Sequence, residues 1–265
     1  MSQNVLVVHG GGPTAVINAS LYGVIEEAKR NPEVGKVYGA IGGTGAIFSE
    51  TFIDLTSFDD EKLKLLLHTP ASAIGSSRYP LYEKDYEKMV DIFKKHDIKY
   101  VLLNGGNGTM DACGHIYEVC KDQDIKVVGI PKTIDNDIAM TDHSPGYGSA
   151  ARFIAASTQE VGEDVKSLPI HVCIMEAMGR NAGWITAASA LARRKQGDAP
   201  HLIYLPERNF NEDEFLEDVS RLQKKQGGVV VLVSEGLHDA NGESIVPPIF
   251  KSERAVYYGD VSSHL

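Results

Sequence analysis

The sequence predicts an α/β fold in which helices sandwich parallel sheets in two similar lobes. Short apolar runs alternate with longer segments of helical periodicity, which is the order of βαβ units. The runs are continuous rather than alternating with polar residues, and this is typical of parallel strands buried on both faces. With 265 residues, of which 43% are hydrophobic, the chain is long enough to bury a substantial core.

The predicted elements follow one another from the N-terminus. "NVLVVHG" is the first strand and "VINASLYGVIEEAKR" the first helix, and "KYVLLNGG" with "TMDACGHIYEVCK" is a second strand and helix pair. Further strands are expected at "KVVGI", "HVCIME", "HLIYLP" and "GGVVVLVSEG", and helices over 149–165, 179–193 and 212–226. We place the boundary between the lobes at Thr141, which divides the chain into residues 1–141 and 142–265.

The acidic composition limits the partners of the chain. Its formal net charge of −10 at pH 7 excludes general affinity for nucleic acid, because phosphate backbones need clustered Lys and Arg. The three cysteines, Cys113, Cys120 and Cys173, have neither metal-ligand spacing nor a disulfide pattern. The apolar run near the N-terminus is too short for a signal peptide or a membrane span. We therefore expect a cytoplasmic protein that does not bind membranes.

Two glycine-rich turns lie between a predicted strand and a predicted helix. In "HGGGPTAVINA" the glycines, Gly11 and Gly12 among them, let backbone amides approach phosphate oxygens beside a helix N-terminus. In "GGNGTMDA", Gly106 and Gly108 do the same, and Thr109 can cap the following helix. Either turn alone is also common as a structural connection, and the first lacks the Gly-Lys-Ser/Thr ending of a P-loop. Together they predict a phosphate site.

The segment "GIPKTIDNDIAMTD" carries the strongest catalytic signal. Asp135 and Asp137 follow a buried strand, so one carboxylate can take a proton from a hydroxyl while the other serves a cation or orients its partner. Lys132 and Thr133 stand just before them and can bind a transferred phosphoryl group. The structural alternative is an Asx-rich turn that caps its own backbone.

Further segments supply charges that suit a phosphorylated substrate. "MEAMGRNAGW" places Gly179 and Arg180 at a strand-to-helix junction, where a guanidinium beside helix amides makes an anion site. Glu235 in "VLVSEGLHD" ends an apolar strand and can accept hydrogen bonds from sugar hydroxyls. Arg78 follows a Gly-Ser loop and Arg254 lies in "KSERAVYYGD"; each alone is typical of a solvated surface charge.

Taken in order from Val5 to about Gly259, these segments resemble the phosphofructokinase family. "TIDND", "MGR", the two glycine loops and "SEG" occur at family-like spacing. The resemblance implies a phosphofructokinase-like fold and phosphoryl transfer to the 1-hydroxyl of fructose 6-phosphate, which gives fructose 1,6-bisphosphate in glycolysis. It also implies that residues 1–141 mainly bind the phosphoryl donor and that residues 142–265 mainly bind the sugar phosphate.

The resemblance implies a role for each matching residue. Asp135 is the expected general base, Asp137 assists at the charged centre, and Thr133 contacts the acceptor or the moving phosphoryl. Lys132 and Arg180 complete the expected catalytic set. On the substrate side the expected contacts are Thr133, Asp135, Met178, Gly179, Arg180, Glu235 and, in many members across a subunit interface, Arg254. On the donor side they are Gly11, Gly12, Arg78, Gly106, Asn107, Gly108 and Thr109.

The donor motifs of this chain are mixed. Members that use ATP typically read "GGDGS", whereas members that use pyrophosphate typically read "GGDDS" and "PKTIDND". Here Gly108 leaves room for a nucleotide, while Lys132 can neutralise a smaller donor. We expect ATP with Mg²⁺, and pyrophosphate is the alternative donor. Asn107 is the expected metal ligand, since an amide oxygen can bind Mg²⁺, although more weakly than a carboxylate.

Two departures from the family pattern keep other functions open. Family chains usually continue beyond "GDVSSHL", and His171 stands where many members place a substrate-binding Arg. The usual C-terminal segment is thus expected to be absent, which makes a noncatalytic nucleotide or sugar-phosphate binding subunit a second hypothesis. Another small-molecule kinase with a Gly-Gly-x-Gly-Thr loop, such as an NAD or lipid kinase, is a third, and "TIDND" followed by "MGR" argues against it. The resemblance also implies a homodimer or homotetramer.

Overall fold

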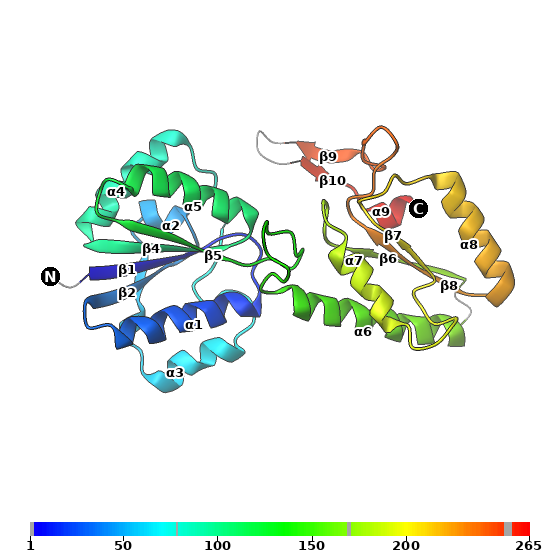
Figure 1. The fold of residues 1–265 in the computed structure, drawn as a ribbon, viewed down its shortest axis with the longest axis horizontal. Coiled ribbons are helices and arrows are strands. Elements are labelled where there is room, and N and C mark those ends of the chain that lie inside the picture. The colour runs from blue at the N-terminus through cyan, green and yellow to red at the C-terminus, as the bar shows by residue number, and fades with distance from the viewer. Residues whose placement is uncertain (1–2, 78, 169–170, 252–255) are drawn as a thin grey trace. The chain divides into compact units, whose positions relative to one another are not determined.

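A computed structural model describes residues 3–77, 79–168, 171–251 and 256–265 of the chain (Figure 1). The chain divides into two compact units, Met1–Thr133 and Ile134–Leu265. The division therefore comes earlier than the boundary that we placed at Thr141. Each unit contains parallel strands packed against helices, which confirms the α/β fold class.

The N-terminal unit is built around a five-stranded sheet. Its strands are β1 (Gln3–His9), β2 (Val34–Ala40), β3 (Phe52–Asp54), β4 (Ile98–Gly105) and β5 (Lys126–Pro131). Their order in the sheet is β3-β2-β1-β4-β5, and all pairs are parallel except that of β2 with the edge strand β3. The helices are α1 (Ala15–Arg30), α2 (Gly45–Phe48), α3 (Asp60–Lys64), α4 (Glu83–Lys95) and α5 (Asn107–Cys120), with 3-10 turns at Leu55–Ser57 and Leu65–His68.

The side chains of β1 show why this strand is apolar throughout. Leu6 and Val8 join a buried cluster with residues of α4 and α5, whereas Val5 and Val7 pack against α1. Figure 1 shows α1 and α3 on one side of the sheet and α4 and α5 on the other. Both faces of β1 are thus covered, as the continuous apolar run predicted.

The C-terminal unit contains a three-stranded parallel sheet and a hairpin. The sheet has the order β6-β8-β7 and consists of β6 (Val172–Ala177), β7 (Leu202–Tyr204) and β8 (Val229–Ser234). The hairpin pairs β9 (Pro248–Lys251) with β10 (Val256–Tyr258). The helices are α6 (Tyr147–Ser167), α7 (Trp184–Ala188), α8 (Glu212–Gln226) and α9 (Val261–His264), with a 3-10 turn at Ser189–Ala192. Central β8 is buried along its length, with Val230 and Leu232 packed toward α6 and α7.

The helix that we predicted over 179–193 is wrong in its first part. β6 ends at Ala177 and α7 begins only at Trp184, so the intervening residues form a turn. Gly179 has a φ of +116°, in the left-handed region that residues with a side chain rarely adopt. The backbone therefore cannot pass from the strand directly into a helix at this point.

The other two long helices predicted in the second half of the chain are confirmed as α6 and α8. α8 begins where Asn211 accepts hydrogen bonds from the backbone amides of Asp213 and Glu214, which satisfies donors that a helix N-terminus otherwise leaves open. No helix in the described part of the chain, α6 included, is long and apolar enough to cross a membrane.

Candidate functional site

Three segments meet at the carboxyl edge of the N-terminal sheet. Parallel pairing sets His9 beside Asn104 and Gly105 beside Pro131, so β1, β4 and β5 end at the same edge. Ligands of open α/β sheets bind at this edge. We call the residues that follow the three strands the glycine cradle, which comprises Gly10–Gly12, Gly105–Thr109 and Lys132. The structure thus brings together the two predicted glycine loops and the predicted lysine.

The side chain of Thr109 lies between the two glycine loops and is almost fully buried. A Cβ atom added to Gly10 or to Gly105 would lie 2.3 Å from the Thr109 hydroxyl oxygen, closer than any real Cβ contact. These two positions therefore require glycine, a fact that the sequence alone did not reveal. Thr109 was expected to cap α5, but no side chain caps that helix, whose N-cap residue is Gly106. Thr109 packs between the loops instead.

Lys132 connects the two loops of the cradle. Its side chain is only 5% exposed, and its Nζ donates a hydrogen bond to the carbonyl oxygen of Gly12. Its backbone amide donates to the carbonyl oxygen of Gly105 over 2.9 Å. A positive charge is thereby fixed in a largely buried position beside the backbone of the first glycine loop, which suits the binding of a negatively charged group.

Asn107 and Gly108 form the exposed start of α5. A helix N-terminus presents unpaired backbone amides, which favour an anion. A Cβ atom added to Gly108 would meet nothing within 4 Å. The packing of the protein therefore accepts a side chain at Gly108, and its absence there is weak evidence for a nucleotide.

The Mg²⁺ prediction depends on Asn107. Among the described residues, no group of three or more His, Cys, Asp and Glu side chains could hold a metal ion. Mg²⁺ commonly takes only one or two protein ligands and fills its shell with substrate phosphates and water. The exposed position of Asn107 at the cradle fits such an ion, and its role as a ligand stays a prediction.

Loop 72–77 supports the first glycine loop from the side. Ser76 Oγ donates to the carbonyl oxygen of Gly11 over 2.7 Å, and the Gly11 amide donates to the carbonyl oxygen of Ser77 over 3.3 Å. Gly11 itself has a φ of +74°, which explains the glycine. Arg78, the predicted donor contact that follows this loop, lies outside the described residues.

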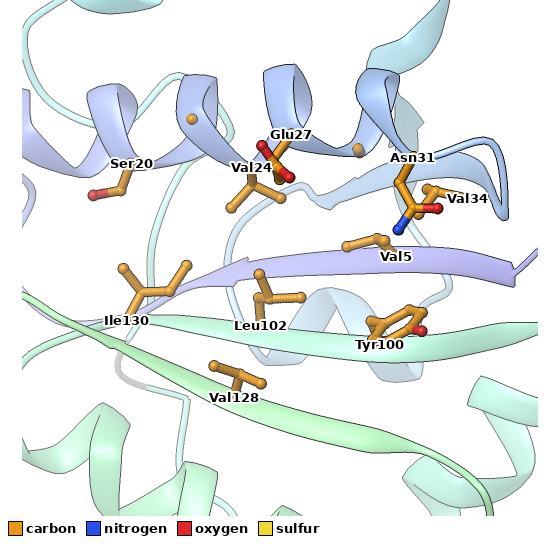
Figure 2. Close-up of a pocket in the computed structure, with 12 residues that line it drawn as sticks. Val5, Ser20, Val24, Glu27, Asn31, Val34, Tyr100, Leu102, Val128 and Ile130 are labelled. Atoms are coloured by element: carbon orange, nitrogen blue, oxygen red, sulfur yellow. The ribbon is translucent and has the colours of Figure 1, made fainter.

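An apolar groove of about 550 Å³ lies on the α1 side of the same sheet (Figure 2). Val5, Leu102 and Val128 line it from the strands, and Val24 and Glu27 line it from α1. A phosphate group needs cations or free amides, whereas the charged residue that lines this groove is an acid. The groove is therefore a poor candidate for the donor site.

The predicted catalytic carboxylates lie in a tight turn at the start of the C-terminal unit. Between them, Asn136 is 7% exposed and has a φ of +57°, a conformation that Asn tolerates better than most residues. Its Oδ1 accepts from the amide of Ser144 over 2.7 Å and its Nδ2 donates to the carbonyl oxygen of Asp142 over 3.2 Å. Asn136 thus holds the turn, while Asp135 and Asp137 are partly buried on either side of it.

The turn after β6 brings together four of the predicted substrate residues of this unit. Glu235 Oε1 accepts from the amide of Gly179 over 3.0 Å, and its Oε2 lies 3.9 Å from the guanidinium of Arg180. The guanidinium lies over the ring of Tyr258, 5.1 Å from its centre. Met178 is exposed next to them. Arg180 therefore lies in a turn and not beside the amides of a helix, which corrects our expectation for this residue.

Glu207, which carries no motif that marks it in the sequence, fixes the far end of this turn. Glu207 Oε1 accepts from the amide of Gly183 over 2.7 Å, and a Cβ atom at Gly183 would lie 2.7 Å from Glu207 Oε2. His171 precedes β6, at the opposite end of that strand from the turn. Arg254, the predicted contact to the 6-phosphate, lies outside the described residues.

Comparison with known proteins identifies the family. A sequence model described as phosphofructokinase matches residues 4–261. The chain belongs to the phosphofructokinase family. This match covers both units, the glycine cradle, the carboxylate turn and the turn that carries Arg180.

Three relatives within this phosphofructokinase family bear on the donor. The chain is 42% identical over 259 residues to the pyrophosphate–fructose 6-phosphate 1-phosphotransferase of Rhodospirillum rubrum, covering 97% of this chain and 64% of that protein. The crystal structure of the pyrophosphate-dependent phosphofructokinase from Marinobacter aquaeolei matches with a TM-score of 0.82 and 40% identity, over 89% of this chain and 61% of that one. The ATP-dependent 6-phosphofructokinase of Amycolatopsis methanolica is 30% identical over 247 residues, 89% of this chain and 52% of that protein. The chain thus spans less than two thirds of the length of each.

Proposed function

We propose that the chain carries the donor and acceptor sites of a pyrophosphate-dependent phosphofructokinase. Membership of the family supports a phosphotransferase acting on fructose 6-phosphate. The sequence motifs placed ATP first among the donors. The relatives named for pyrophosphate are more similar to this chain than the ATP-dependent relative is, and they favour the alternative donor.

Within the chain, the buried position of Lys132 is the observation that supports pyrophosphate as the donor. Pyrophosphate has no base or sugar to bind, so its charge must be met by fixed cations and backbone amides. Lys132 is buried and bonded to Gly12 in the cradle, and the start of α5 supplies amides at the same place. The donor-side residues of this proposal are Gly11, Gly12, Arg78, Gly106, Asn107, Gly108 and Thr109.

The proposed reaction is a direct phosphoryl transfer. Asp135 takes the proton from the 1-hydroxyl of fructose 6-phosphate, and the resulting oxygen forms a bond to phosphorus as the bond to the leaving phosphate breaks. The products are fructose 1,6-bisphosphate and inorganic phosphate. Asp137 assists at the charged centre, while Thr133 and Lys132 bind the moving group and stabilise its charge. Asn107 would hold Mg²⁺ bound with the donor, and the ion would supply further neutralisation of phosphate charge.

The turn after β6 is the proposed sugar-phosphate site. Arg180 supplies the positive charge, and Glu235 holds both Arg180 and Gly179 in place besides accepting from sugar hydroxyls. Met178 lies at the exposed edge of the turn. We propose that Arg254 contributes from a neighbouring copy, so that the active form is a homodimer or homotetramer.

A coupled assay with fructose 6-phosphate and Mg²⁺, run in parallel with pyrophosphate and with ATP, tests the proposal. We expect turnover with pyrophosphate, and we expect Asp135→Asn to lower kcat by about 1,000-fold, within the usual range for a general base. Asp142→Asn is the matched control, because Asp142 is an exposed residue of the same turn. Light scattering of the same preparation gives the number of copies in the assembly.

Three outcomes would count against the proposal. Turnover with ATP but not with pyrophosphate would support ATP, the donor that the sequence motifs favoured. Gly108→Asp would then be expected to remove ATP use. Full activity of Asp135→Asn would remove that residue from the role of base. Binding of pyrophosphate or fructose 6-phosphate without any turnover would support the noncatalytic binding subunit.

A further inference from the structure

His9 is a buried titratable residue at the cradle for which the proposed reaction has no use. It is the last residue of β1 and is fully buried. Along β1, Val5 and Val7 face α1, and the alternation of a strand places His9 on the same face. Its parallel partner on β4 is Asn104, whose Nδ2 donates to the carbonyl oxygen of Ile17 in α1. The ring therefore lies beneath the first turn of α1, next to the first glycine loop.

The hydrogen bonds of His9 define which ring nitrogen carries the proton. Nδ1 lies 2.7 Å from Ser72 Oγ, and Ser72 Oγ in turn donates to the carbonyl oxygen of Gly75 over 2.7 Å. A hydroxyl has one proton, so Ser72 must accept from His9, and Nδ1 is the protonated nitrogen. Burial and the positive charge of Lys132 lower the pKa of His9 from 6.5 to about 4. The ring is neutral at pH 7, and Nε2 is left as an acceptor.

Loop 72–77 links the hydrogen bond between His9 and Ser72 to the glycine cradle. Ser76 Oγ of this loop donates to the carbonyl oxygen of Gly11, and the Gly11 amide donates to the carbonyl oxygen of Ser77. The loop is also tightly packed, since a Cβ atom at Gly43 would lie 2.7 Å from the amide nitrogen of Ser77. The loop has little freedom to shift without moving Gly11, and with it the neighbouring carbonyl that receives Lys132.

We propose that His9 is a positioning residue of the donor site, which holds loop 72–77 against the first glycine loop through Nδ1 and so sets Gly11, Gly12 and Lys132 for the donor. The inference rests on the proposed function for the identity of the donor. It assigns the effect to one ring nitrogen, Nδ1, because Nε2 is buried without a hydrogen-bond partner among the described residues.

Two substitutions separate the ring nitrogens. In His9→Asn the amide nitrogen occupies the place of Nδ1 and can still donate to Ser72. In His9→Gln the amide reaches the place of Nε2, so the bond to Ser72 is lost. Both variants remove the ring and its titration. Ser72→Ala removes the same bond from the other side while leaving His9 intact.

The readout is the KM for pyrophosphate against the KM for fructose 6-phosphate. Loss of one buried hydrogen bond is expected to raise the KM for pyrophosphate about tenfold in His9→Gln and in Ser72→Ala. We expect His9→Asn to stay within about threefold of wild type, and the KM for fructose 6-phosphate to change less than twofold in all three. Thermal unfolding of each variant, followed by circular dichroism, separates loss of stability from loss of donor binding.

Three results would overturn the proposal: equal loss in His9→Asn and His9→Gln, a rise in both KM values together, or a lower unfolding temperature with donor KM unchanged. Calorimetric titration with magnesium pyrophosphate distinguishes this failure from that of the proposed function. If the wild type binds pyrophosphate without turnover, the same tenfold pattern is expected in its Kd. If it binds neither pyrophosphate nor ATP, both proposals are wrong.

Discussion

Gly236 directly follows Glu235 and controls the position of Arg180 through backbone contact alone. A Cβ atom added to Gly236 would lie 1.8 Å from the carbonyl oxygen of Arg180 and 2.7 Å from its Cα. Real Cβ contacts of this kind are at least 3.0 Å, so the alanine requires a displacement of about 1.2 Å between the two backbones. The turn has little room to adjust, because Ser234 Oγ and Glu235 hold Gly179 on both of its backbone groups.

A misplacement of about 1 Å in a substrate-binding group typically costs about 100-fold in rate. We therefore expect Gly236→Ala to lower kcat/KM for fructose 6-phosphate about 100-fold while the KM for pyrophosphate stays within about twofold. The measurement is the coupled assay with each substrate varied in turn, with circular dichroism to establish that the variant is folded.

Gly259→Ala is the matched control for this experiment. Gly259 belongs to the same unit, and the nearest atom to its added Cβ lies at an ordinary 3.9 Å. We expect wild-type kinetics from this variant. A folded Gly236→Ala enzyme with kcat/KM for fructose 6-phosphate within about threefold of wild type would refute the assignment of Arg180 to substrate binding, given the displacement that the alanine enforces.

Three further predictions concern single residues. Burial and the charge of Lys132 lower the pKa of His9 from 6.5 to about 4. The unfolded chain therefore binds this proton at a higher pH than the folded chain does, and the free energy of unfolding drops by about 3 kcal/mol as the pH falls from 6.5 toward 4. Urea unfolding of His9→Asn should lack this loss, and a pH dependence equal to that of the wild type would contradict the prediction. Glu207→Ala removes the acceptor for the Gly183 amide and should raise the KM for fructose 6-phosphate about fivefold, which corresponds to about 1 kcal/mol. Glu207→Gln keeps an acceptor oxygen and should restore the wild-type KM. Equal kinetics of the two variants would show that the Glu207 hydrogen bond does not position the turn for substrate. Gly23 lies exposed within α1, and a Cβ atom added to it would have nothing within 4 Å. Gly23→Ala should therefore raise the free energy of unfolding, measured in urea, by about 1 kcal/mol. A lower free energy of unfolding would contradict this prediction.

Local sequence features predicted most of the parallel-strand architecture. Val229–Ser234 is apolar because both faces of β8 are covered, and this was visible in the sequence as an uninterrupted run. The β9–β10 hairpin was not predicted. Its strands are only four and three residues long, and propensity is a weak guide to such strands.

The sequence by itself determined the chemistry of the candidate site. It placed glycines, Lys132 and Asp135 directly after apolar strands, and parallel strands necessarily bring their carboxyl ends to one edge of a sheet. Asn107 and Gly108, the two residues that bear on the choice of donor, were expected in the glycine turn before the helix, whereas the structure places them in the first turn of α5. Their meaning changed once the space around Gly108 was known.

Only the tertiary structure decided which residues hold that chemistry in position. The need for glycine at Gly10 arises from Thr109 of the second glycine loop, and Gly105 packs in turn against the carbonyl oxygen of Gly10. The tautomer of His9 is set by Ser72, 63 residues away along the chain. Glu207 fixes Gly183 in the same manner. Contacts between segments far apart in sequence leave no periodic or local signal, because any residue of suitable size and polarity can make them once the fold has brought the segments together.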